Sequence, residues 1–444
     1  MPTSPLIRLR ERISGEVVLP GEPAYPDLKN GFVHQGQPAA VVRCAGTGDV
    51  QEALRCAREE GLPVAVRSSG HSNAGLSTND GGMVIDLRPM AEVELLDRGQ
   101  RLVRLGSGAT WGEASQVLGR HDLAISSGDT ATVGVGGLLL GGGIGWLARR
   151  YGLAMDSLVA AELVTADGAI VRAGADSDPE LFWALRGGGG NFGVVTAFEL
   201  TASRVPGVFY AEISYPRSEA AAVLKGWRDY LRTAPEELTS FAYLYPSFGG
   251  DPMPLYLAAC YAGDDPAGAE RALAPLLALG PVLTKDVTPR PYLEMLGEPG
   301  PLPPGLVPVV KNRFADRLSD PLIDKLVAET DRLETLYVEL RSLGGAVAAV
   351  DPAATAFACR GSEALVMTVL LSNDPGPEAE FGSMWSQLGA LTSPFGYGNF
   401  LSSATAADVA AVYPPATYHR LAAVKARLDP DNVFRSNLNV PPAG

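Results

Sequence analysis

The sequence contains few of the side chains that most often bind metal ions. Its 444 residues include only four histidines, His34, His71, His121 and His419, and only four cysteines. No two cysteines form a CxxC pair, a spacing typical of metal sites in proteins. A large metal centre is therefore excluded, and we expect the protein to work without a bound metal.

Basic charge is also scarce. Lysine and arginine total 36 against 50 aspartates and glutamates, which gives a formal net charge of −14 at pH 7. Proteins that bind nucleic acids carry clustered positive charge for the phosphate backbone. An acidic chain without basic clusters predicts no nucleic-acid partner.

Long hydrophobic runs are missing as well. The first twelve residues are charged by position 8 and contain no apolar segment of the kind found in a signal peptide. The longest uncharged stretch, residues 130–148, has seven glycines among nineteen residues, and each glycine costs a helix about 1 kcal/mol. We therefore expect no contact with a membrane, and we predict a cytoplasmic protein with reduced cysteines.

Glycine, in contrast, is abundant. Of 51 glycines, sixteen lie between residues 128 and 193, mostly in two stretches at 134–145 and 187–193. Glycine is used where φ must be positive or where the backbone must approach a ligand closely. Two such stretches in one unit indicate a large ligand against the main chain, although close packing of a sheet on a helix is an alternative explanation.

Two common nucleotide motifs can be tested against the second stretch. Gly188-x-Gly190-x-x-Gly193 matches the dinucleotide fingerprint, which requires a strand before it and a helix after it. Here residues 178–186 predict a helix, with Asp178 as its cap, and residues 194–200 predict a strand. The order is inverted, so a Rossmann site is excluded. No GxxxxGK[ST] occurs either, which excludes a P-loop.

The N-terminal half otherwise alternates between strands and helices, which favours an α+β fold. The pattern predicts strands at 38–43, 63–67, 83–87 and 101–105, and helices at 47–60, capped by Thr47, and at 111–118.

His71 lies in a polar loop directly after the predicted strand at 63–67. The segment Arg67-Ser-Ser-Gly-His-Ser72 offers a cation, hydroxyls and free backbone N–H groups, which suit a pyrophosphate. The same loop puts an imidazole within reach of a ring system attached to that pyrophosphate. A purely structural role for His71 remains open on the residues alone.

The chain resembles the flavin-linked oxidases of the berberine bridge enzyme type, within the vanillyl-alcohol oxidase superfamily. The resemblance is carried, in the order of the family, by residues 66–72, 133–145, 150–156, 185–195, 418–425 and 429–437. It implies a PCMH-type FAD-binding domain of two subdomains and a substrate domain with an antiparallel sheet flanked by helices. It also implies an FAD cofactor.

The resemblance further implies that His71 carries the 8α-methyl group of FAD covalently. Many members attach the flavin a second time through a cysteine, where this chain has Thr130. We therefore expect a single attachment, as in the monocovalent bacterial branch of the 6-hydroxy-D-nicotine oxidases. Val133 corresponds to the position that gates dioxygen, and a small valine there favours an oxidase. The other residues expected to bind the cofactor are Arg67, Ser68, Ser69, Gly70, Ser72, Gly128, Gly134, Gly137, Gly141, Gly142, Gly145, Val195 and Asn437.

Three units are expected along the chain. Residues 1–204 form the FAD-binding domain, residues 205–400 the substrate-binding domain, and residues 401–444 a segment that returns to the first domain. In the middle unit we predict a loop at 297–308 within a set of antiparallel strands and helices. The strands are expected at 209–215, 241–245, 255–261, 337–341 and 365–371, and the helices at 217–233, 265–278 and 320–333.

The segment Phe395-Gly-Tyr-Gly-Asn-Phe400 resembles the part of the family that faces the flavin. Tyr397 is the first candidate for the substrate base or a positioning group, and Asn399 for orientation; as a base, Tyr397 would need a lowered pKa. Arg360 is a candidate for binding substrate or balancing the charge of the flavin, with a solvated surface arginine as the alternative. Cys359 stands where members often have histidine.

The sequence thus predicts an FAD-dependent oxidase. It would pass a hydride from a C–H bond next to oxygen or nitrogen in a small alcohol, amine or natural-product intermediate to flavin N5, with dioxygen as the second substrate and hydrogen peroxide as product. A flavin-dependent dehydrogenase or reductase on the same fold, and a flavin-holding protein without turnover, are the alternatives.

Overall fold

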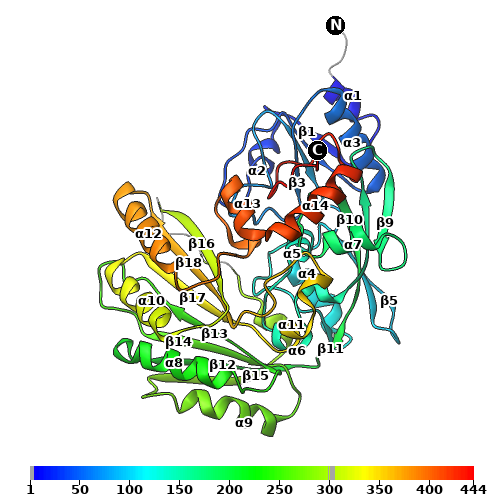
Figure 1. Ribbon diagram of the computed structural model, residues 1–444. Helices are drawn as coiled ribbons and strands as arrows, with labels where there is room; N and C mark the ends of the chain where they lie inside the picture. The colour runs from blue at the N-terminus through cyan, green and yellow to red at the C-terminus, as the bar shows by residue number, and fades with distance from the viewer. Residues whose placement is uncertain (1–4, 299, 301–305) are drawn as a thin grey trace.

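The computed structural model describes residues 5–298, 300 and 306–444, which form two lobes (Figure 1). The first lobe contains two small sheets and a two-stranded ribbon, and the second contains one large sheet. This mixture of helices and mainly antiparallel sheets confirms the predicted α+β class. Within the described part of the chain, we find no helix that is both long and apolar enough to cross a membrane.

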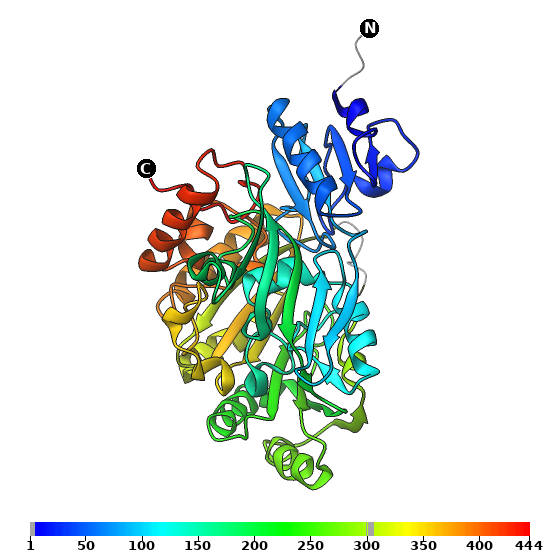
Figure 2. The ribbon, with the colours of Figure 1, turned by 90° about the vertical axis from the view of Figure 1, so that its right-hand side faces the viewer.

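The N-terminal sheet lies at the end of the molecule far from helix α9 (Pro266–Leu277) (Figure 2). Its strands follow the order β1-β2-β4-β3, with β1 antiparallel to β2 and the other pairs parallel. The predicted strands are confirmed to within two residues at each end. The elements here are α1 (Pro5–Leu9), β1 (Glu16–Val18), α2 (Tyr25–Leu28), β2 (Ala40–Arg43), α3 (Thr47–Glu59), β3 (Val64–Arg67) and β4 (Met83–Asp86).

The prediction that Thr47 caps α3 is wrong by one residue. An N-cap residue has an extended backbone, and this conformation is taken by Gly46. Thr47 is the first helical residue, and its hydroxyl donates to Glu162 of the next sheet instead (3.1 Å). The buried face of α3 places Val50, Leu54 and Ala57 in the core.

The second sheet is antiparallel throughout and follows the order β5-β6-β10-β8-β9. Helix α7 precedes the second glycine stretch and strand β10 follows it, which confirms the inverted order that excludes a Rossmann site. Asp178 caps α7 by accepting the N–H of Leu181 (3.0 Å). The elements are β5 (Val93–Asp97), β6 (Leu102–Gly106), α4 (Trp111–Gly119), β7 (Leu123–Ala124), α5 (Val135–Gly141), α6 (Ala148–Tyr151), β8 (Leu158–Val164), β9 (Ile170–Gly174), α7 (Pro179–Leu185), β10 (Val194–Thr201) and β11 (Ser203–Arg204).

The second lobe is a seven-stranded antiparallel sheet with four helices on its outer face (Figure 1). The strand order is β15-β12-β14-β13-β17-β18-β16, and the other face of the sheet is turned toward the first lobe. The strands are β12 (Val208–Tyr215), β13 (Leu238–Leu244), β14 (Leu255–Tyr261), β15 (Thr284–Arg290), β16 (Val307–Ala315), β17 (Leu336–Ser342) and β18 (Ala364–Ser372). The helices are α8 (Ala220–Leu231), α9, α10 (Asp320–Arg332) and α12 (Pro375–Leu388), with the short α11 (Ala346–Ala349) near α6.

The five strands and three helices predicted for this lobe are present. The predicted loop at 297–308 lies partly outside the described residues, and its last two residues belong to β16, which together with β15 and α12 was not predicted. β15 is an edge strand with the polar sequence Thr-Lys-Asp-Val-Thr-Pro-Arg and mostly exposed side chains, so it lacks an apolar alternation.

The last two helices, α13 (Ala406–Val412) and α14 (Pro415–Leu428), lie against the first lobe. The side chains of Lys425 and Asp429 are fully buried, with the ammonium 2.6 Å from the carboxylate. Lys425 also donates to the carbonyls of Asn191 and Phe434, each at 2.8 Å. This buried pair ties the C-terminal segment to the second glycine stretch.

Candidate active site

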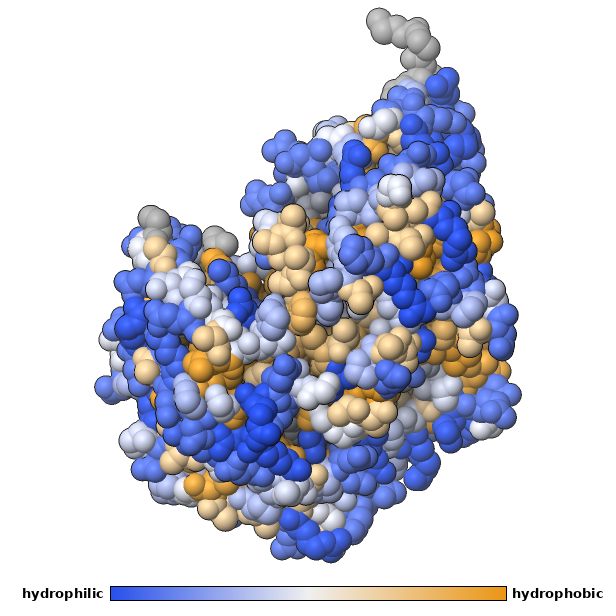
Figure 3. All heavy atoms as spheres, viewed as in Figure 1, coloured by the Kyte–Doolittle hydropathy of each residue, from blue (hydrophilic) through white to orange (hydrophobic). Residues whose placement is uncertain are grey.

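A cavity of about 610 Å³ lies between the two lobes. Its volume is in the range of small-molecule and cofactor sites. The space-filling view shows the surface hollowed between the lobes, with apolar residues at the floor (Figure 3). The walls come from the loop at 68–73, both glycine stretches, one face of β16, β17 and β18, and the C-terminal segment at 434–438.

The His71 loop forms one wall of the cavity. Ser68, Ser69, Gly70, His71 and Ser72 all line it. Ser68 Oγ donates to the carbonyl of Ser107 (2.6 Å) and accepts the N–H of Gly136 at 3.3 Å. The loop is therefore docked on the first glycine stretch.

His71 is held by an aromatic neighbour. The ring of Phe32 stacks on the imidazole with 4.5 Å between ring centroids and 18° between planes. Burial lowers the pKa of His71, with an opposing contribution from Glu298, so the imidazole is neutral at physiological pH. A neutral ring nitrogen is nucleophilic, and this one lies at the cavity wall.

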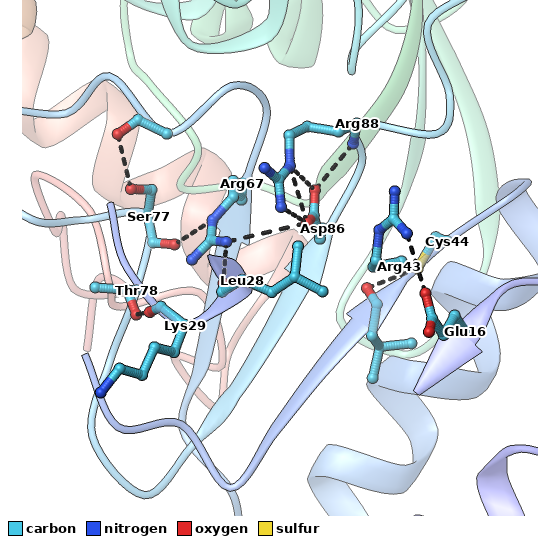
Figure 4. Close-up of polar contacts among 12 residues, drawn as sticks. Glu16, Leu28, Lys29, Arg43, Cys44, Arg67, Ser77, Thr78, Asp86 and Arg88 are labelled. Carbon is cyan, nitrogen blue, oxygen red and sulfur yellow. Dashed lines mark hydrogen bonds and ion pairs between the residues drawn. The ribbon is translucent and has the colours of Figure 1, made fainter. Parts of the chain in front are cut away.

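Arg67 does not line the cavity. Its side chain is 1% exposed, donates to the carbonyls of Leu28 and Ser77, and lies 4.0 Å from the carboxylate of Asp86 (Figure 4). The expectation that Arg67 binds a pyrophosphate therefore does not fit its position. Alternation along β3 directs this side chain into the N-terminal subdomain, where it supports the base of the His71 loop.

The first glycine stretch contributes Gly134, Gly137 and Gly141 to the cavity wall, next to Gly128. Gly142 and Gly145 do not line it. A Cβ on Gly145 would lie 2.1 Å from the carbonyl oxygen of Ser127, so this glycine serves close packing between chain segments. Gly142 has a φ of +130° and lies against Phe357.

The second glycine stretch lines the cavity with Gly187, Gly189, Gly190 and Gly193, followed by Val195. Asn437 also lines it and donates to the carbonyl of Gly190 at 3.1 Å. The Oδ1 atom of Asn437 is buried and has no hydrogen-bond partner among the described residues.

These walls fit a large planar cofactor such as FAD. A Cβ on Gly137 or Gly190 would meet no atom within 4 Å, so the backbone there is bare on the cavity side. The hydroxyls of Ser69 and Ser72 and Oδ1 of Asn437 are available polar groups on the same cavity. Thr130 and Val133 line it too, and Thr130 Oγ1 donates to Asp129 at 3.2 Å.

Tyr397 and Asn399 both line the cavity, but Tyr397 is not suited to act as a base. Burial raises its pKa to about 12. Its hydroxyl oxygen accepts hydrogen bonds from the N–H of Gly143 (2.9 Å) and from Nδ2 of Asn399 (2.8 Å). Both lone pairs of the oxygen are engaged, so the phenol can only donate its own proton.

Arg360 is placed outside the cavity. Its guanidinium forms a two-point ion pair with Asp156, at 2.7 and 2.9 Å, and is 0% exposed. Neither a substrate-binding role nor a solvated surface position fits this arrangement. The neighbouring Cys359 lines the cavity, and burial raises its pKa to about 12, so its thiol is neutral.

Sequence reasoning missed three polar side chains of β17. Tyr337, Glu339 and Arg341 alternate along the strand and point into the cavity. The Tyr337 hydroxyl donates to Glu339 Oε2 at 3.0 Å, and Nε of Arg341 lies 2.6 Å from Glu339 Oε1. The missed signal is two charged residues two apart in an otherwise apolar strand, because such residues share one face.

Glu339 is the carboxyl group that the second lobe presents to the cavity. It is 3% exposed, and burial raises its pKa, with Arg341 opposing and Asp129 adding to the rise. The contact of Oε1 with Arg341 is close but poorly directed for a hydrogen bond, which leaves this oxygen available to another donor. A buried carboxyl with a raised pKa is suited to proton transfer.

Comparisons with known proteins match both halves of this site. One family model, an FAD binding domain, covers residues 38–174, and a second, berberine and berberine like, covers residues 397–441. (R)-6-hydroxynicotine oxidase of Paenarthrobacter nicotinovorans is 33% identical over 97% of this chain and 98% of its own. Xylooligosaccharide oxidase of Thermothelomyces thermophilus is 30% identical over 91% and 88%. The crystal structure of 6-hydroxy-D-nicotine oxidase from Arthrobacter nicotinovorans matches with a TM-score of 0.87 and 30% identity over the whole of both chains.

Proposed function

Because the chain belongs to the berberine bridge enzyme-like family of FAD-linked oxidases, we propose that it takes a hydride from a C–H bond next to nitrogen or oxygen in a small, largely apolar molecule. Its activity is that of an FAD-dependent oxidase. When bound, FAD supplies the hydride acceptor and passes the electrons to dioxygen, which yields hydrogen peroxide. The side chains of the cavity orient the substrate and move its proton.

His71 is proposed as the one covalent attachment point of the cofactor, through the 8α-methyl group. The support is a neutral imidazole fixed by Phe32 at the wall of the cavity. Thr130 lines the same cavity but carries a hydroxyl, which forms no thioether. The loop at 68–72, the glycines that line the cavity, Val133, Val195 and Asn437 would hold the non-covalent part.

Denaturation tests this attachment. Acid-precipitated wild-type protein should stay yellow, and its band in a denaturing gel should fluoresce. His71→Ala should release all of its FAD on denaturation while still binding it in the folded state, and Thr130→Ala should keep the covalent flavin. A colourless wild-type precipitate would overturn the proposal.

Glu339 is proposed as the base that takes the proton from the substrate N–H or O–H as the hydride leaves. The observation that carries this is a buried carboxyl at the cavity whose Oε1 lies in an ion pair with Arg341 without a directed hydrogen bond. Tyr397 would donate a hydrogen bond, and Asn399 keeps its hydroxyl in place. The remaining side chains on this side of the cavity are mainly apolar, including Val310, Phe314, Met367 and Val369.

An amine or alcohol attached to an apolar or aromatic skeleton fits this lining better than a sugar, which needs many hydrogen-bond partners. One relative is named as an oxidase of a hydroxynicotine and another as an oxidase of xylooligosaccharides. We propose that the substrate is an amine or alcohol of the first kind and not an oligosaccharide. The four free cysteines support a cytoplasmic location.

A substrate panel tests this choice. Aromatic amines, benzylic alcohols and oligosaccharides would be mixed with the holoenzyme without oxygen, and flavin bleaching and then peroxide on admission of air would be recorded. We expect turnover among the amines or alcohols, with Glu339→Gln lowering kcat about 10²–10⁴-fold. Glu334→Gln, at an exposed position just before β17, is the control. Turnover of oligosaccharides alone, or an unchanged kcat in Glu339→Gln, would contradict the proposal.

A further inference from the structure

Arg341 connects the two lobes at the cavity. Its Nη2 donates to the carboxylate of Asp129, which stands between Gly128 and Thr130 in the first lobe. Its Nη1 donates to the carbonyl of Ile144 at 3.1 Å, and its Nε lies 2.6 Å from Glu339. The guanidinium also lies over the rings of Phe241 and Phe400. A single buried cation is therefore shared between two carboxylates from different lobes.

The sharing is unequal. The contacts of Arg341 with Asp129 and Ile144 are directed hydrogen bonds, whereas its contact with Glu339 is not. Charge-assisted hydrogen bonds are roughly twice as strong as neutral ones, so the guanidinium is oriented by Asp129. Glu339 interacts with the same guanidinium at 2.6 Å through its charge, without a directed hydrogen bond.

The other groups that face Glu339 carry no charge. Tyr337 is on the same strand as Glu339. The ring of Tyr243, on the adjacent strand β13, stacks on the ring of Tyr337, and the ring of Tyr245, just after β13, is tilted against it. Burial raises the pKa of all three phenols, so they stay neutral. Met367, opposite Glu339 on β18, has no ionisable group. Among the described residues, Asp129 and Arg341 are thus the charges that act on Glu339 at close range.

We propose that Asp129 is a positioning residue of the reaction: by holding Arg341, it keeps Glu339 a stronger base than a fully paired carboxylate would be. This inference rests on the proposed role of Glu339. A carboxylate with its own directed bond to arginine is a weak base, because the ion pair favours the charged form. Asp129 competes with Glu339 for Arg341, and it does so from the loop that also carries Thr130. A residue in the wall of the cofactor site thus affects the proton affinity of Glu339 on the substrate side.

The proposal predicts opposite effects from two substitutions on one side chain network. Asp129→Asn removes a negative charge and frees Arg341 for Glu339, so the titration midpoint of Glu339 should fall by about one pH unit or more. Arg341→Met removes the positive charge, so the midpoint should rise by a similar amount. A purely structural role would not move the two midpoints in opposite directions.

Infrared difference spectra of the oxidised holoenzyme between pH 4 and 9 measure this without a substrate. The protonated carboxyl band that is missing from Glu339→Gln identifies Glu339, and its midpoint is then read in each variant. Asp431→Asn, in an exposed pair with Arg58, should leave the midpoint unchanged. A midpoint that does not fall in Asp129→Asn, or a wild-type spectrum without the Glu339 band in this range, would overturn the inference.

A cooperative thermal unfolding transition with a wild-type far-UV circular dichroism spectrum shows that a variant has folded. If Arg341→Met does not fold, Arg341→Lys and Asp129→Asn test the proposal instead. Lysine keeps the positive charge but cannot make the same set of hydrogen bonds. Arg341→Lys should therefore shift the midpoint of Glu339 less than Asp129→Asn does. Full activity in Glu339→Gln would refute the base itself, while the spectra would still report on Asp129.

Discussion

Each buried arginine near the cavity makes hydrogen bonds within the protein, and one guanidinium nitrogen of each is left without a hydrogen-bond partner among the described residues. Arg67 is bonded to backbone carbonyls, Arg360 is paired with Asp156, and Arg341 is occupied by Asp129. An arginine with most of its donors already used has little to offer a ligand, because turning toward the ligand would break existing hydrogen bonds in a place where water cannot replace them. The substrate side of the cavity therefore presents a carboxyl and neutral phenols, which suits a substrate that donates hydrogen bonds and disfavours a carboxylate or phosphate.

Tyr397→Phe tests the assignment of this phenol as a fixed donor. The substitution leaves the buried N–H of Gly143 and the amide of Asn399 without an acceptor, at a cost of about 1–3 kcal/mol. We expect a lower thermal unfolding midpoint and slower flavin reduction, with an unchanged pH dependence of the reduction rate. Tyr25→Phe loses one hydrogen bond to Pro38, far from the cavity, and should lower only the stability. An altered basic arm of the pH profile in Tyr397→Phe would instead identify the phenol as a base.

At this scale the sequence predicts which residues cluster but not where every side chain points. The loop at 68–72 and most of the chosen glycines line the cavity as expected. The alternation of β3 directs Arg67 away from the cavity. Gly145 is needed because a side chain there would collide with a neighbouring carbonyl, and it does not line the cavity. Glu339 could not be selected because the register of β17 in the sheet, which decides the face it occupies, depends on contacts with distant strands.

Elements far apart in the chain hold the glycine stretches in place. Five of the seven residues of the second stretch are glycines without side chains, and bonds from α14 and the segment that follows help to fix its shape. Lys425 and Asn437 both donate to carbonyls of this stretch. Rigid support of this kind keeps a cofactor site at the required geometry.

Lys425→Met should reveal this support. It leaves Asp429 buried without its cation, which costs about 3–5 kcal/mol, and it removes a bond to Asn191. We expect a lower unfolding midpoint and a lower fraction of protein with bound flavin after purification. Arg427→Met, on the same helix but half-exposed in its pair with Asp178, should cost less than about 1 kcal/mol. Equal losses in the two variants would contradict a special role for Lys425.

The strands of the second lobe show where sequence patterns are informative. Those in the middle of the sheet, such as β14 and β18, are buried and rich in apolar and aromatic residues, and they were found. The two edges were not: β15 is polar and exposed, and β16 follows a proline-rich segment that reads as a loop. An edge strand gains its conformation from the neighbour it pairs with, and this information is not local.

At the scale of the whole molecule, the cavity walls are shared between two lobes, so a bound cofactor would contact both of them. A ligand that binds only the folded state stabilises it by mass action. A covalent cofactor is always present, whereas a free one acts according to its concentration.

His71→Ala should replace a covalent cofactor by one that binds reversibly. The unfolding midpoint of this variant should rise with added FAD, by the equivalent of about 2.7 kcal/mol at a free concentration 100 times the dissociation constant. The wild-type midpoint should not change over the same range. A wild-type protein that responds to FAD, or a variant that does not, would contradict a single histidyl attachment.

The C-terminal segment at 434–438 forms part of the cavity wall, together with residues 68–72 from the beginning of the chain. A ribosome releases residues 68–72 long before it has made residues 434–438. The complete wall of the pocket can therefore form only after the C-terminal segment has been made, so FAD can gain its full set of contacts only at the end of synthesis. The supply of FAD in the cell, and the time that the empty protein survives proteolysis, would then decide how much active enzyme accumulates.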